Sequence, residues 1–181
     1  MEIVKKVIFI VFLLPVLAYS QKDETLNKFK FHATSISPLS VYVYSFEPGA
    51  GGGLALSADV SFEYSKKHLF SLGVATGSEI NILGPSNNFG EINVLYGREF
   101  ALSRTLFFEV HGGAGYFNFS SRSGSRGTEH MSTIGFPLVT KLRIMTGSRF
   151  SLGVQIKGNF NSIKSYYTGG LILQWNRKRS K

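Results

Sequence analysis

The 181-residue chain contains no cysteine and carries few charges. The missing cysteine excludes a disulfide framework and a thiolate metal site. Charged residues make up 17% of the chain, whereas a soluble domain normally has about 25%. We therefore expect part of the surface to face something other than water.

Long hydrophobic runs are also scarce. The longest apolar stretch covers residues 7–18, which is shorter than the roughly 20 residues of a membrane-spanning helix. Two lysines precede it, and Ala18 and Ser20 follow in the pattern of a cleavage site, so residues 1–20 are predicted to be a secretory signal peptide. No cysteine follows the stretch, which excludes a lipoprotein anchor. The lack of a second run excludes a helical inner-membrane protein and leaves the periplasm, the medium and the outer membrane.

The charge that is present is mostly positive, with a formal net charge of +9. This balance favours contact with anionic surfaces. The basic residues form neither a helical stripe nor an aromatic–basic platform, so nucleic acid is not an expected partner.

Aromatic residues are plentiful at 14%, and apolar residues alternate with small or polar ones. The segment that begins at Phe150 reads FSLGVQIKGN, and such alternation is the signature of a strand. We predict eight strands, over residues 39–46, 53–64, 69–82, 89–100, 106–119, 131–144, 150–161 and 166–176. Most reach the 9–11 or so residues that a tilted transmembrane strand requires. The fold class predicted is an all-β, eight-stranded antiparallel up-and-down transmembrane barrel; ten strands and a soluble barrel are the alternatives.

The connections between these strands alternate in length. Short turns at residues 65–68, 101–105 and 145–149 each pair a serine with a basic residue, whereas residues 120–130 form a longer polar connection. Outer-membrane barrels have short periplasmic turns and longer external loops. The alternation of short and long connections places residues 120–130 outside the cell, where they are a candidate contact for an extracellular partner.

The polar faces of the strands show which side is inside. They carry small residues and, in chain order, acids before bases: Asp59, Glu63, Glu79, Glu91, Glu99 and Glu109, then Lys141, Arg143 and Lys157. We expect these charges to pair across the lumen, because an eight-stranded barrel is just wide enough to be filled by side chains. An open channel is therefore not expected. Aromatic residues near strand ends fit interfacial girdles: Tyr64, Phe100, Tyr116, Phe150, Tyr167 and Trp175.

Three features fit this pattern less well. Pro137 lies within a strand, where we predict a bulge because proline removes a ladder hydrogen bond. Arg98 falls on the lipid face, near enough to the periplasmic end to reach the interface. Residues 29–34 also alternate, and they either extend the first strand past Pro38 or form a separate strand.

Over residues 39–176 the sequence resembles the small outer-membrane β-barrels of the OmpX and OmpA-barrel type. The resemblance implies residence in the outer membrane of a Gram-negative bacterium, contact with lipid and lipopolysaccharide, and insertion by the barrel-assembly machinery. Residues 21–38 would be a lead or an extension of the first strand, and residues 177–181 a basic tail after Trp175. Members of this family commonly end in an aromatic residue, a pattern from which this tail departs. Family roles include anchoring, adhesion and lipid modification.

Candidate active residues are few. His111 and Glu109 share an inward face and form either a proton-transfer pair or, as we favour, a satisfied polar pair in the lumen. Arg122 and Arg126 could meet lipopolysaccharide phosphates or lie in a solvated loop. The chain has no GxSxG, HExxH or phosphate-loop motif, and its four histidines are His32, His68, His111 and His130. We therefore assign no catalytic, metal or cofactor residue.

The leading hypothesis is a non-enzymatic outer-membrane barrel with a structural or surface-interaction role. The alternatives are a soluble lipocalin-like ligand carrier and a lipid A-modifying enzyme.

Overall fold

The structure is a computed structural model, and it describes residues 29–44, 51–65, 68–80, 87–123 and 127–177. The predicted signal peptide, Arg126 and the tail beyond Arg177 lie outside the described residues.

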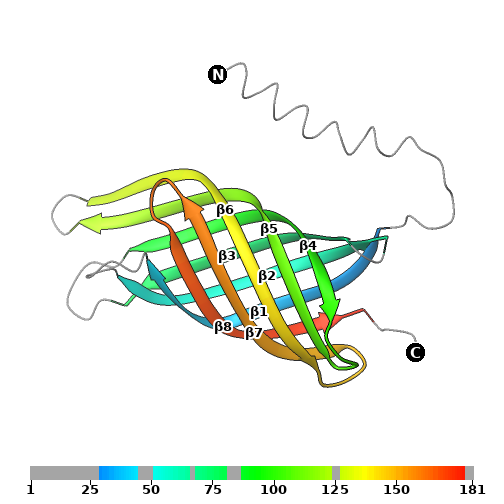
Figure 1. Ribbon diagram of the computed structural model, residues 1–181. Helices are drawn as coiled ribbons and strands as arrows, with labels where there is room; N and C mark the ends of the chain where they lie inside the picture. The colour runs from blue at the N-terminus through cyan, green and yellow to red at the C-terminus, as the bar shows by residue number, and fades with distance from the viewer. Residues whose placement is uncertain (1–28, 45–50, 66–67, 81–86, 124–126, 178–181) are drawn as a thin grey trace, which may run out of the picture.

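Eight antiparallel strands close into a single barrel in which each strand pairs with its neighbours in the chain and β8 pairs with β1 (Figure 1). The strands are β1 (Lys30–Tyr44), β2 (Gly52–Tyr64), β3 (His68–Glu79), β4 (Asn88–Ala101), β5 (Leu106–Ser123), β6 (Gly127–Met145), β7 (Phe150–Asn161) and β8 (Tyr166–Asn176). The predicted fold class and strand count are confirmed. We call the end where β1 begins and β8 finishes the turn end, and the opposite end the loop end.

Three of the predicted strand boundaries were wrong by four residues or more. The first strand begins at Lys30 rather than at residue 39, so residues 29–34 extend it instead of forming a ninth strand. The connection predicted over residues 120–130 is mostly strand, because β5 continues to Ser123 and β6 starts at Gly127. Both strands are therefore longer than the other six, and their hairpin projects at the loop end (Figure 1).

The two strand prolines behave differently from each other. The predicted bulge at Pro137 is wrong: β6 keeps one register with β7 on both sides of Pro137↔Asn159, and its register with β5 is unchanged across the same position. Register shifts occur instead in β1, between Ser37 and Ser40, where Pro38 lies. There the strand pairs with neighbours on both edges, so a bulge accommodates the missing donor.

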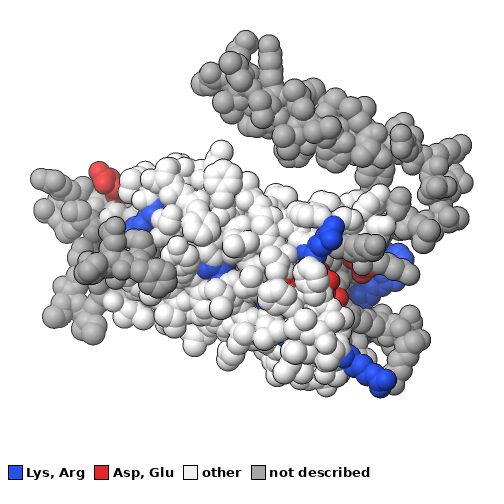
Figure 2. Space-filling model, viewed as in Figure 1, with Lys and Arg blue, Asp and Glu red and all other residues white. Residues whose placement is uncertain are grey.

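The outer surface of the wall is apolar and the inner surface is polar. Leu72, Ile92, Val94, Ile156 and Leu171 are each 58–66% exposed. By contrast, many buried side chains are polar or charged. One face of the molecule shows mostly uncharged side chains between its two ends (Figure 2). Within the described residues, no helix is long and apolar enough to cross a membrane.

Candidate functional site in the barrel interior

Arg143 is the centre of a buried charged cluster near the turn end. Its guanidinium is 0% exposed and donates from Nε to Glu109 Oε1 at 2.9 Å and from Nη1 to Asn176 Oδ1 at 3.0 Å. Nη2 lies 2.7 Å from the same Glu109 oxygen and also contacts Glu99. The planar guanidinium suits this role, because its donors point in several fixed directions at once.

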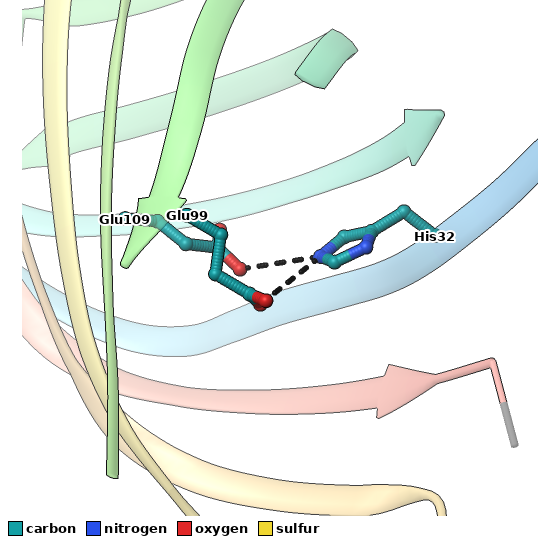
Figure 3. Close-up of side chains that lie close together, drawn as sticks. All are labelled: His32, Glu99 and Glu109. Carbon is teal, nitrogen blue, oxygen red and sulfur yellow. Dashed lines mark hydrogen bonds and ion pairs between the residues drawn. The ribbon is translucent and has the colours of Figure 1, made fainter. Parts of the chain in front are cut away.

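Two histidines complete this cluster. His32 Nε2 lies 3.4 Å from both Glu99 Oε2 and Glu109 Oε1 (Figure 3). His111 Nε2 lies 3.1 Å from the other oxygen of Glu109. The predicted His111–Glu109 pair is confirmed as a contact. Glu109, itself 0% exposed, thus has a hydrogen-bonding partner on each carboxylate oxygen.

The group formed by His32, Glu99 and Glu109 could in principle ligate a metal, since its ligand atoms lie within 4.8 Å of one another. Arg143 contacts both of these carboxylates. A divalent cation placed among them would face the guanidinium at short range, where two positive charges repel strongly. The arginine therefore serves as the resident cation of this cluster, and the residues present do not fit a metal.

A serine, a histidine and a carboxylate lie in a row inside the barrel, although no sequence motif predicts this arrangement. Ser71 Oγ lies 3.4 Å from His111 Nδ1, on the far side of the ring from Glu109. Such an arrangement is what nucleophilic catalysis requires. All three residues are at most 3% exposed, and the adjoining cavity of about 20 Å³ has room for about one water molecule. A cavity of this size is too small for an acyl chain, so we expect no acyl transfer at these residues.

Replacing Ser71 by alanine tests that conclusion. Ser71 hydrogen-bonds Ser61 at 2.9 Å, so we expect S71A to lower the free energy of unfolding by about 1 kcal/mol. We expect the lipid A composition of cells that express S71A to match that of cells that express the wild type. Urea titration of the folded barrel and mass spectrometry of lipid A measure the two effects. A change in lipid A that requires Ser71 would contradict this assignment.

Two further buried ion pairs lie farther from the turn end than Arg143 does. Lys141 Nζ is 2.8 Å from Asp59 and 2.9 Å from Ser35 Oγ. Lys157 contacts Glu91. Together with the Arg143–Glu99 pair, these contacts confirm that the bases of β6 and β7 face acids from β2 and β4 across the lumen, whereas Arg143 and Glu109 pair between the adjacent strands β6 and β5.

The interior near the loop end is aromatic rather than charged. Its buried cluster contains Tyr42, Tyr44, Ala55, Phe89, Phe117, Phe119 and Tyr166. Ring centroids lie 4.4 Å apart for Phe89 and Tyr166 and 5.0 Å apart for Tyr42 and Phe89. Gly77 permits this packing, because a Cβ there would strike the Phe89 ring. Along the described strands, the aromatic cluster and the ion pairs thus occupy different levels of the lumen.

The other predicted candidates do not join this interior. His130 is exposed and lies 2.8 Å from Ser120 Oγ on the long hairpin, and His68 contacts the Tyr96 hydroxyl at 2.7 Å. Of the four histidines, only His32 and His111 converge. Sequence reasoning missed His32 and the aromatic cluster. Side chains on a strand alternate between its two faces. Because Glu91 and His111 point inward, counting in steps of two along their strands would have predicted that Phe89, Phe117 and Phe119 also point inward.

These features together define a class: the chain has the fold of the small eight-stranded outer-membrane barrels. Its structure is similar to that of Neisserial surface protein A, with a TM-score of 0.66 at 8% sequence identity over 81% of this chain and 97% of that one. It also resembles Ail, the attachment invasion locus protein of Yersinia pestis (TM-score 0.60, 11% identity, 81% and 98% covered). The N-terminal β-barrel domain of Pseudomonas aeruginosa OprF is comparable (TM-score 0.59, 11% identity, 83% and 100% covered).

At these identities the likeness extends to the fold alone. No protein-family description matches the chain, and no curated protein is similar to it in sequence.

Proposed function

We propose that this protein is an exported, non-enzymatic barrel of the outer membrane of a Gram-negative bacterium, with a structural or surface-interaction role. The observation that carries the proposal is the inverted polarity of the wall. Isoleucine, leucine and valine side chains are more than half exposed outside, while Lys141 and Arg143 are at most 3% exposed inside. In water this arrangement would leave a large apolar surface unburied, whereas in a bilayer it is the stable one.

The same observation opposes the soluble lipocalin-like alternative. A soluble ligand carrier would turn its bulky apolar faces inward and its charged faces to water. Here the lumen is lined by ion pairs and packed rings, so an apolar ligand would find no apolar cavity of its size inside.

Fractionation of cells that express the full chain tests the proposed location. We expect the protein with the outer membranes, and we expect it to migrate faster on a gel before boiling than after it. Recovery in the soluble periplasm, without a shift on heating, would refute the proposal. Accumulation in outer membranes only when the barrel-assembly machinery is active would support that machinery as the partner for insertion.

The long β5–β6 hairpin is the proposed contact surface on the outside of the cell. The residues from Gly127 to Ser132 are all exposed, and at the loop end β5 and β6 extend past the ends of the other strands (Figure 1). With Arg122 and Arg126 in the same connection, lipopolysaccharide phosphates or an extracellular partner are the proposed contacts. Shortening the hairpin should abolish such binding without affecting the heat-dependent gel shift.

A further inference from the structure

The turn end of the barrel carries four arginines that the buried ion pairs do not use. They are Arg98 on β4, Arg104 in the β4–β5 turn, Arg149 in the β6–β7 turn and Arg177 after β8, and all four are exposed. We call them the arginine arc. Among the described residues, no ion pair includes any of the four. Their charge is therefore available to a partner.

Backbone hydrogen bonds join the segments that carry the arc. Met145 N donates to Thr105 O at 2.8 Å, which ties the β4–β5 turn to the β6–β7 turn. Asn176 N donates to Arg149 O at 2.6 Å, and Arg177 N donates to His32 O at 2.8 Å. The arc thus follows one continuous stretch of the rim, from β4 to the start of β1.

The acids of this stretch point away from the arc. Glu99 and Glu109 lie on the inner face, where they contact Arg143 and His32. Glu63 lies farther round the rim, opposite Lys30 in the β1–β2 register. In the space-filling view, several basic side chains lie at the end of the barrel where the termini are, with a smaller number of acidic atoms between them (Figures 1 and 2). The arc therefore presents a positive field to its surroundings.

Aromatic side chains lie directly beside the arc on the outer wall. Phe100 and Trp175 are 48% and 52% exposed, and each is two residues from an arginine of the arc. Trp175 packs on Phe150 with a centroid distance of 5.1 Å, and Phe150 follows Arg149. Exposed aromatic rings of this kind mark the level of the membrane–water interface. Arginines at the same level can reach lipid phosphates with their long side chains.

From this placement we propose that the arginine arc binds the headgroups of anionic phospholipids in the leaflet at the turn end. The proposal rests on the outer-membrane location proposed above. Each guanidinium donates to phosphate oxygens while its apolar stem covers the neighbouring ring. Because the arc spans only part of the rim, it gathers anionic lipid on one side of the barrel.

Lipid selectivity in a reconstituted bilayer tests the proposal. The full chain is folded into vesicles of phosphatidylcholine that contain a minor fraction of phosphatidylglycerol. Spin-labelled phosphatidylglycerol and spin-labelled phosphatidylcholine then report which lipid is immobilised at the barrel. We expect the wild type to prefer phosphatidylglycerol by at least about twofold, and this preference to fall in high salt, which screens surface charges. The variant R98Q/R104Q/R149Q should show no preference.

Two control variants separate charge from other effects. R98K/R104K/R149K keeps the charges and should retain most of the preference. K164Q removes a positive charge at the loop end, where Lys164 packs over the Tyr44 ring, and should leave the preference unchanged. Equal immobilisation of both lipids by the wild type, or an undiminished preference in R98Q/R104Q/R149Q, would overturn the proposal.

The gel shift on heating, measured in the same vesicles, keeps this test apart from the proposed function. A barrel that inserts and shifts but selects no lipid contradicts only the arginine arc. A barrel that inserts into no vesicle contradicts the proposed location, and the arc falls with it. The three Gln substitutions could instead leave lipid selectivity intact and release the barrel from purified cell-wall sacculi. That result would overturn the proposal and show that the arc binds the anionic cell wall rather than lipid.

Discussion

Replacing Arg143 by methionine is expected to lower the free energy of unfolding by about 3–5 kcal/mol, because the change leaves buried charge without a partner. Arg143 and Glu109 are both 0% exposed. Methionine fills much of the arginine's volume, so the loss reports mainly the charge. His32 and His111 remain beside Glu109 at 3.4 and 3.1 Å, but neither contributes the permanent charge of a guanidinium. Urea titration of the barrel folded in vesicles measures the effect.

Two comparison variants show whether the loss comes from the unpaired carboxylates. K30M removes an exposed basic residue from the same rim but outside the arginine arc, and it should change the free energy of unfolding by less than about 0.5 kcal/mol. E99Q/E109Q/R143M neutralises both carboxylates along with the arginine and should recover much of the loss, because neither carboxylate is then left charged without the arginine. A cost for R143M no larger than that of K30M would contradict the central role of this cluster.

The alternation of side chains determined most of what could be predicted. In a closed barrel each residue faces either the lumen or the outside, so parity alone placed Lys141, Arg143 and Lys157 inward. Size and charge then distinguished a lipid-facing wall from a soluble one. The strands β7 and β8 have the predicted bounds, 150–161 and 166–176.

The choice of partners inside the lumen could not be predicted in the same way. Glu109 and Lys141 are directly opposite in the β5–β6 register. Lys141 nevertheless pairs across the lumen with Asp59 on β2, while Glu109 binds Arg143, which lies two residues farther along the adjacent strand β6. Partners across the lumen depend on the tilt and stagger of all eight strands, which no local pattern contains. The sequence also could not distinguish Pro38, where the strand has a bulge, from Pro137, where the register is unchanged. Proline lacks a backbone donor, and a sheet can accommodate this either by a bulge or by leaving one hydrogen bond of the ladder unformed.

The aromatic cluster at the loop end was missed because the prediction for aromatic residues covered only those expected in the outer girdles, and none of these belongs to the cluster. Parity would have corrected this for Phe117 and Phe119, which share the face of His111. Both are at most 4% exposed. The inward face of β5 thus changes along the strand from charged to aromatic. The direction of each side chain follows from its position in the alternation and not from its residue type.

Placing arginine at Val94 should cost about 2–4 kcal/mol of unfolding free energy in a bilayer, as expected for a basic residue at mid-membrane on the lipid face. Val94 lies near the middle of β4, is 61% exposed and is paired with Leu72 of β3, which is 58% exposed. N88R introduces the same side chain at the exposed loop-end start of this strand and should cost about 0–1 kcal/mol, since the guanidinium lies near the interface there. Urea titration in the same vesicles compares the two variants. Equal costs at the two positions, or a V94R barrel as stable as the wild type, would mean that water rather than lipid surrounds this wall, because an exposed valine in water tolerates arginine at little cost.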